Sequence, residues 1–271
     1  MLQPSRPTSP RNKVFSVIRE SPALSYYAFV PEVFDPSRPP LVCVHGISRN
    51  AAEMAFAFSE QAARRGIALL APIFTKDRQR FFQKLAVGDG GLRADIAFNG
   101  MLAHAHETLG LGIEKIQLFG YSAGGQFAHR YTLLNPERVA GQVLFAPGWY
   151  TFPTERHDFP LGLRRPADID LGTLNLAGSL DIPTYVMVGT ADTRRDPSVN
   201  TEPVVDQLQG LNRLERARRW VSAMRQAAAD RDKAPRITLT EIPDATHLFS
   251  RNLGRLNLPA NVFNHLYGAA R

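Results

Sequence analysis

Short apolar runs alternate with longer amphipathic stretches from Leu41 onward. The runs have the length of buried strands and lie at 41–44, 67–72, 116–119, 142–146 and 185–188, and a last strand at 237–242 alternates apolar and polar residues. The stretches that separate the early runs favour helices, at 51–65, 92–109 and 125–131. Strands that alternate with helices indicate a mainly parallel sheet with helices on both faces. Residues 14–30 are expected to add antiparallel strands at one edge.

A later stretch carries the densest basic cluster, at residues 213–219. Apolar residues recur there every three or four positions, which predicts an amphipathic helix whose arginines mostly face water. The chain has a formal net charge of +7, but this cluster comes with no motif of a nucleic-acid-binding module. The charge therefore indicates a solvated surface, and no nucleic-acid partner is expected.

The 271 residues, 44% of them hydrophobic, are enough for a real core. We expect a flexible arm at residues 1–13, which lack the apolar centre of a signal peptide, and a single domain at 14–271. No apolar run approaches the ~18 residues needed for a membrane span. Cys43, the one cysteine, lies in an apolar run and is expected to be buried, so the chain has no intrachain disulfide. These features favour a cytoplasmic protein. They leave the oligomeric state open.

The motif G-x-S-x-G occurs at residues 120–124, with Ser122 at its centre. An apolar strand is predicted immediately before it and a helix immediately after it, which is the setting that makes this short motif specific. Such a turn exposes the serine hydroxyl at the edge of a sheet, and its glycines allow the strand and helix to cross closely. Ser122 is therefore the candidate nucleophile. A serine nucleophile also requires a base and an acid that orients the base.

Candidates for the base and the acid follow in the order Ser, Asp, His. Asp192 comes just after the strand at 185–188, and His247 comes after the last predicted strand. Asp196 and Asp244 are the alternatives to Asp192, although Asp244 has the sequence surroundings of a turn. The histidines lack the H-E-x-x-H spacing of a zinc site, so neither a metal nor a cofactor is expected.

The sequence His45-Gly46-Ile47-Ser48 follows the first of the apolar runs. Together with the serine motif and the order of Asp192 and His247, it resembles the α/β-hydrolase superfamily. The resemblance implies the α/β-hydrolase fold, a mainly parallel twisted sheet covered by helices. It also implies an oxyanion hole made by the backbone N–H groups of Ile47 and Ala123, with Ser48 as the alternative to Ile47.

Residues 147–180 interrupt the alternation of strands and helices. A segment of this length between core strands is usually functional, and we interpret it as a short, irregular cap over the site. Its first aromatic residues, Trp149, Tyr150 and Phe152, are candidates for a substrate pocket. Tyr121 either lines that pocket or packs beneath the turn. An ordinary surface loop is the alternative interpretation.

The leading hypothesis is a serine hydrolase that cleaves a small carboxylic ester through an acyl-enzyme. The chain loosely resembles the esterases grouped with polyhydroxyalkanoate depolymerases and feruloyl esterases. An amidase or peptidase with the same three residues is one alternative. A non-catalytic binding protein of the same fold is the other, because fold alone does not determine function.

Overall fold

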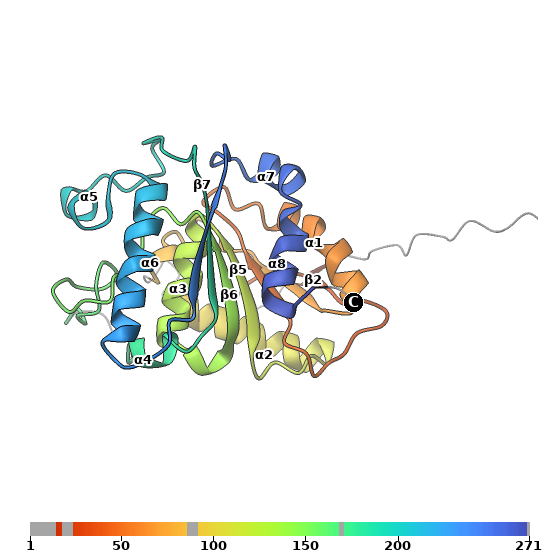
Figure 1. Cartoon of the computed structure of the whole chain (residues 1–271). Coiled ribbons are helices and arrows are strands. Elements are labelled where there is room, and N and C mark those ends of the chain that lie inside the picture. The colour runs from red at the N-terminus through yellow and green to blue at the C-terminus, as the bar shows by residue number, and fades with distance from the viewer. Residues whose placement is uncertain (1–14, 18–23, 86–91, 168–170, 270–271) are drawn as a thin grey trace, which may run out of the picture.

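The computed structural model describes residues 15–17, 24–85, 92–167 and 171–269. The predicted arm at 1–13 lies outside them. Within the described residues, one eight-stranded sheet has the order β1-β2-β4-β3-β5-β6-β7-β8 (Figure 1). The strands are β1 (Phe15–Val17), β2 (Tyr26–Phe29), β3 (Leu41–Val44), β4 (Leu69–Pro72), β5 (Ile116–Tyr121), β6 (Val139–Phe145), β7 (Thr184–Gly189) and β8 (Ile237–Ile242).

The sheet is mainly parallel, as the alternating pattern predicted. Strand β2 pairs antiparallel with β1 and with β4, and every other pairing is parallel. The antiparallel strands expected within 14–30 are therefore confirmed. The six parallel strands, β3 to β8, bring their carboxyl ends to the same edge, where ligands bind in open sheets of this kind.

Helices cover both faces of the sheet (Figure 1). On one face α1 (Ala51–Arg65) lies against α8 (Leu258–Tyr267), and the ring of Phe58 stacks on Phe119 of β5 at 4.9 Å. On the other face, ring contacts join α3 (Ala123–Leu134) to α2 (Ala94–Leu109) and to α6 (Arg213–Ala229). The described residues also form five short helices: η1 (Phe82–Lys84), η2 (Pro136–Arg138), α4 (Leu176–Ser179), α5 (Pro203–Gln209) and α7 (Phe249–Arg255).

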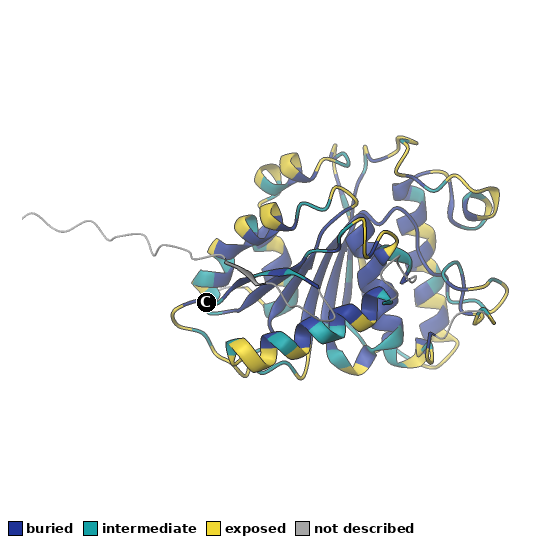
Figure 2. Cartoon of the chain, turned by 180° about the vertical axis from the view of Figure 1, so that it is seen from behind, coloured by how far each residue is buried: buried dark blue, intermediate teal, exposed yellow. Residues whose placement is uncertain are grey.

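The core lies between the sheet and its helices. Every residue of β3 and β5 is buried, and so is nearly every residue of α3, whereas α1 and α6 have exposed outer faces (Figure 2). Cys43 is buried as expected, and burial raises the pKa of its thiol well above the ordinary value. Burial on both faces explains why the central strands have continuous apolar sequences, without the alternation of a half-exposed strand. Among the described residues, no helix is both long and apolar enough to cross a bilayer.

The segment 147–180 forms loops, with residues 168–170 outside the described part. It contains an isolated bridge between Asp158 and Arg164, and it ends in the short helix α4. Hydrogen bonds from Trp220 to the Thr151 carbonyl and from the Thr151 N–H to His129 hold its first part against α6 and α3. In Figure 1 its loop lies beside α6. A covering role over the site stays a prediction.

Strand β5 and helix α3 approach β3 so closely that no side chain fits between them. A Cβ atom added to Gly124 would lie 2.0 Å from the Val44 carbonyl oxygen, and one added to Gly120 would lie 2.3 Å from the Gly124 carbonyl oxygen. Both contacts are with backbone, which cannot turn aside as a flexible side chain can. The crossing predicted from the glycines of the serine motif is therefore present.

We predict that Gly124→Ala destabilises the protein by about 2 kcal/mol or more, because the added methyl group forces the helix and strand apart. Gly254→Ala in α7 is the matched control, since nothing lies within 4 Å of the Cβ atom it would add. That control should be neutral or stabilising by about 0.5–1 kcal/mol. Urea unfolding measures both changes. Equal stability of the two variants would contradict the prediction.

Candidate active site

Ser122 occupies the sharp turn between β5 and α3. Its backbone has φ 53° and ψ −112°, an unusual conformation for any residue other than glycine. Hydrogen bonds on both sides hold the turn: the Ser122 N–H donates to the Phe145 carbonyl at 2.8 Å, and the Gln126 N–H donates to the Ser122 carbonyl at 3.1 Å. The strand and the helix thus fix a strained residue in place. The side chain is directed to the carboxyl edge of the sheet.

His247 connects Ser122 to Asp192. Its Nε2 lies 3.0 Å from the Ser122 Oγ, and its Nδ1 lies 2.8 Å from an Asp192 carboxylate oxygen, Oδ2. A carboxylate only accepts hydrogen bonds, so Nδ1 carries the proton and Nε2 is free to accept the serine proton. The structure thus brings together three residues that the sequence predicted as nucleophile, base and orienting acid.

Asp192 lies in the tight turn that follows β7. Its N–H donates to the Gly189 carbonyl at 3.1 Å, and the neighbouring Ala191 N–H donates to the Ala245 carbonyl at 3.1 Å. The second bond ties this turn to the loop that carries His247. The Asp192 side chain is only 2% exposed, so little solvent competes for its hydrogen bonds.

The two alternative acids lie elsewhere. Asp196 is hydrogen-bonded to Arg213 and Ser198. Asp244 is 89% exposed in a turn with φ 55°, and its N–H donates to the Thr190 hydroxyl. The structure therefore places Asp192 against His247 and gives Asp244 the turn position that the sequence indicated.

Tyr121 contacts His247 in two ways. Its ring stacks on the imidazole with centroids 5.2 Å apart, and its hydroxyl donates to the His247 carbonyl at 2.6 Å. Burial and the nearby Asp192 raise the pKa of this phenol, so it remains a hydrogen-bond donor. Of the two positions that the sequence left open, the structure shows Tyr121 packed inside, 5% exposed, where it supports the loop of His247.

The loop after β3 passes close to Ser122. A Cβ atom added to Gly46 would lie 3.6 Å from the Ser122 Cβ. In the described part of the chain, the backbone N–H groups of Ile47 and Ala123 donate no hydrogen bond. Ala123 begins α3, where the helix dipole favours negative charge. Both groups suit an oxyanion, and their roles as its donors stay a prediction.

His45 supports this loop from inside. Its Nδ1–H donates to the Gly46 carbonyl at 2.8 Å, and its Nε2 accepts from the Phe74 N–H at 3.1 Å. Both nitrogens are therefore occupied when the ring is neutral. Burial lowers the pKa of His45 to about 4, because a charged ring would lose its hydration. The hydrogen bond to the Gly46 carbonyl opposes this shift in part.

The aromatic residues of segment 147–180 are largely buried. Tyr150 is fully buried with its ring stacked on Trp220 at 4.6 Å, and Trp149 packs against the guanidinium of Arg130 at 4.3 Å. Phe152 is 7% exposed. Tyr150 therefore has no free surface for a substrate in this structure. Substrate contacts by Trp149 and Phe152 stay a prediction.

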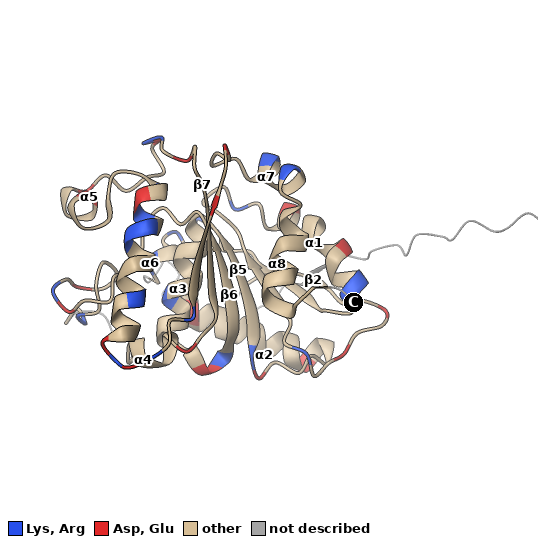
Figure 3. Cartoon of the chain, viewed as in Figure 1, with Lys and Arg blue, Asp and Glu red and all other residues tan. Residues whose placement is uncertain are grey.

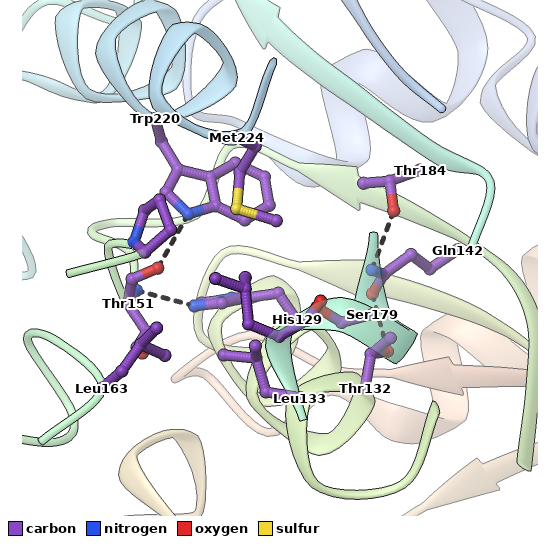
Figure 4. A pocket seen from close by; sticks show the side chains of 12 residues that line it. His129, Thr132, Leu133, Gln142, Thr151, Leu163, Ser179, Thr184, Trp220 and Met224 are labelled. Atoms are coloured by element: carbon purple, nitrogen blue, oxygen red, sulfur yellow. Dashed lines mark hydrogen bonds between the residues drawn. The ribbon is translucent and has the colours of Figure 1, made fainter. Parts of the chain in front are cut away.

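A small pocket beside this segment is separate from Ser122. It is lined by side chains of segment 147–180 and of α3, β6, β7 and α6, and hydrogen bonds link Thr132 to Gln142 and Gln142 to Thr184 (Figure 4). Neither Ser122 nor His247 lines it. We therefore place the candidate site at the open edge of the sheet.

The prediction for the arginine cluster was wrong in part. Arg213 and Arg216 are fully buried, whereas the side chains of Arg218 and Arg219 are about half exposed. Asp206 pairs with Arg216, and Asp192 and Asp196 pair with Arg213. The helical pattern could not predict these pairs, because the carboxylates lie in other elements. Elsewhere, the Lys and Arg residues visible in Figure 3 are scattered over helices and loops.

The fold is that of the α/β-hydrolases, and structural neighbours are esterases and other hydrolases of that fold. A poly(3-hydroxybutyrate) depolymerase, LpqC, from Bordetella parapertussis has a TM-score of 0.75 and 25% identity, over 96% of this chain and 91% of its own. Poly(aspartic acid) hydrolase-1 from Sphingomonas sp. KT-1 has a TM-score of 0.74 and 24% identity, over 88% and 94%. An S-formylglutathione hydrolase from Agrobacterium tumefaciens has a TM-score of 0.59 and 14% identity, over 95% of each chain. No family model and no curated protein sequence matches this chain.

We predict that stability falls as the pH decreases from about 6.5 to about 4, in part because of His45. Between these pH values the histidine is protonated in the unfolded chain but remains neutral in the folded protein. Lowering the pH therefore stabilises the unfolded state relative to the folded state. The contribution is on the order of 3 kcal/mol across the range. His45→Gln keeps an acceptor for Phe74 but cannot titrate. Urea unfolding at several pH values should show a shallower pH dependence in this variant. An unchanged slope would contradict the assignment.

Proposed function

We propose that this chain is a serine hydrolase that cleaves carboxylic esters through an acyl-enzyme. The observation that carries the proposal is the hydrogen-bonded series Ser122, His247, Asp192 at the carboxyl edge of the sheet. Two features support it further: the strained turn that presents Ser122, and the two unoccupied N–H donors beside it. A non-catalytic binding protein of the same fold would not require these three features together.

In the acylation step, the Ser122 Oγ attacks the ester carbonyl carbon while His247 Nε2 accepts the hydroxyl proton. Asp192 keeps the proton of His247 on Nδ1 and stabilises the imidazolium that forms. The N–H groups of Ile47 and Ala123 bind the negative oxygen of the tetrahedral intermediate. The intermediate then collapses, and the imidazolium gives its proton to the departing alcohol.

In the deacylation step, water replaces the alcohol. His247 accepts a proton from water as the oxygen attacks the acyl carbon, and the same two N–H groups stabilise the second tetrahedral intermediate. Collapse releases the acid and returns the proton to Ser122. The stacked Tyr121 ring holds the imidazole in place, so His247 faces Ser122 in both steps.

We infer that the substrate is a small-molecule ester. The support comes from a neighbour described as a naproxen esterase, and from the exposed side chains of Ile47 and Leu248, which lie next in sequence to the Gly46 loop and to His247. The cap at 147–180 would act from the side of α3 and α6.

A second candidate is an amide hydrolase that acts on an anionic substrate. The poly(aspartic acid) hydrolase among the neighbours and the net charge of +7 favour it. An ester and an amide with the same acyl group distinguish the two functions, because only the leaving group differs. Faster turnover of poly(aspartic acid) than of neutral esters would favour the second candidate.

We predict that Ser122→Ala remains folded and loses ester hydrolysis by about a thousandfold or more, because the nucleophile is gone. Hydrolysis of p-nitrophenyl acetate and labelling by a fluorophosphonate measure the loss. Ser222→Ala, which changes an exposed serine of α6, is the matched control and should retain both. If folded Ser122→Ala keeps more than a tenth of the activity, this mechanism fails.

A further inference from the structure

A buried guanidinium lies directly behind the candidate acid. Arg213, the first residue of α6, has a fully buried side chain, and its Nη1 donates to the Asp192 Oδ1 at 3.1 Å. The other Asp192 oxygen accepts from His247. The carboxylate is therefore held at both oxygens, by a cation on one side and by the imidazole on the other.

A second carboxylate fixes the guanidinium. Asp196 accepts from Arg213 Nη1 at 2.9 Å and from Nη2 at 3.3 Å, and the Ser198 hydroxyl also accepts from Nη2. The Ser198 N–H donates in turn to Asp196 at 2.8 Å. The start of α6 is itself held, because the Asn212 side chain accepts from the Glu215 N–H at 3.0 Å. Arg213 therefore has one well-defined position.

We propose that Arg213 is a positioning residue that aligns Asp192 with His247. Asp196 offsets the positive charge of Arg213, and so limits the effect of that charge on the protonation of His247. The proposal rests on the function proposed above. It assigns a role to Asp196, which does not contact His247. In this arrangement two carboxylates and one guanidinium lie behind His247, with a net charge of −1. They stabilise the imidazolium less than the two carboxylates would without Arg213, when the charge would be −2.

The surrounding groups leave this charge balance intact. Burial raises the pKa of both Tyr121 and Tyr150, so these phenols remain neutral. Burial also raises the pKa of Asp196, but hydrogen bonds from Arg213 and Ser198 outweigh it and hold the pKa below its usual range. The titratable and charged groups that act on this cluster come from several elements: Tyr121 on β5, Tyr150 after β6, Asp192 and Asp196 after β7, and Arg213 and Arg216 on α6.

Substitutions of Arg213 and of Asp196 should shift the pH profile in opposite directions. Removing the cation with Arg213→Met makes protonation of His247 easier, so the pH of half-maximal kcat/KM on the acid side should rise by roughly 0.5–1 unit. Removing an anion with Asp196→Asn makes protonation harder, and that midpoint should fall by a similar amount. A purely structural role would lower activity in both variants without displacing the midpoint in opposite directions.

Arg216→Met is the matched control. Arg216 is equally buried on the same helix, but it pairs with Asp206 and donates to the carbonyls of Gly148 and Gly210. Its charge acts on Arg213 but is paired with Asp206 and does not contact Asp192, so its loss should displace the midpoint less than the loss of Arg213 does. Arg213→Lys keeps the charge and should restore the wild-type midpoint even where kcat is reduced.

The experiment measures kcat/KM for p-nitrophenyl acetate from pH 4.5 to 9 in the full chain and its variants, with folding checked by circular dichroism. A parallel NMR titration follows the His247 Cε1–H signal, assigned with His247→Gln. Opposite displacements in Arg213→Met and Asp196→Asn support the proposal. Equal midpoints, or displacements in one direction, overturn it. If Arg213→Met does not fold, Asp196→Asn decides: a lower midpoint supports the proposal, and an unchanged or higher midpoint overturns it.

The two proposals fail in different ways. A wild-type protein that hydrolyses neither esters nor amides contradicts the proposed function. The NMR midpoints then still test the charge balance, because they require no turnover.

Discussion

The close crossing of β5, α3 and β3 is the constraint on which the site depends. A helix that begins within contact of the Val44 carbonyl leaves no room for a Cβ atom at Gly124. The chain must therefore reverse sharply at Ser122, and the backbone enters a region that side chains rarely adopt. The same crossing places Ala123 at a helix N-terminus and brings Gly46 beside Ser122. One packing requirement thus sets the position of the hydroxyl and of both neighbouring N–H groups.

Burial and hydrogen bonding divide the histidines into different roles. His45 and His129 are buried, and each uses both ring nitrogens for backbone hydrogen bonds, so a proton would break a contact. Burial lowers the pKa of both rings accordingly. His247 differs because its two ring nitrogens meet a carboxylate and a hydroxyl. Its side chain is 20% exposed, which gives it access to solvent and substrate. This is the arrangement that a base needs, and it distinguishes His247 on physical grounds.

Local sequence patterns could predict much of the fold. Short apolar runs and helical periodicity located the strands and the main helices, because a buried parallel strand and an amphipathic helix each leave a direct mark on the sequence. The helix predicted at 51–65 has the observed bounds. Helices α5, α7 and α8 were missed: α5 and α7 are short, and α8 is positioned by packing against α1. Such helices owe their stability to tertiary contacts more than to propensity.

The site shows the same division. The motif around Ser122 is local, and its neighbours in sequence indicated its geometry. The contact between Tyr121 and His247 joins residues 126 positions apart, and the pair of Arg213 with Asp192 spans 21. A helical pattern places a residue on a face, but it does not show that a carboxylate from another loop will cover that face. Arg213 therefore looked like a solvated residue in the sequence, although it is one of the most buried side chains in the described structure.

The central claim is that Ser122 becomes covalently acylated, and trapping that intermediate tests it most directly. The protein would be mixed with p-nitrophenyl acetate, quenched in acid within the first turnovers, digested and analysed by mass spectrometry. Our account predicts one acetyl group on the peptide that contains Ser122, formed together with a burst of p-nitrophenol and lost after the substrate is consumed. Steady hydrolysis with no acetyl group on that peptide, or with the acetyl group on another residue, would contradict it.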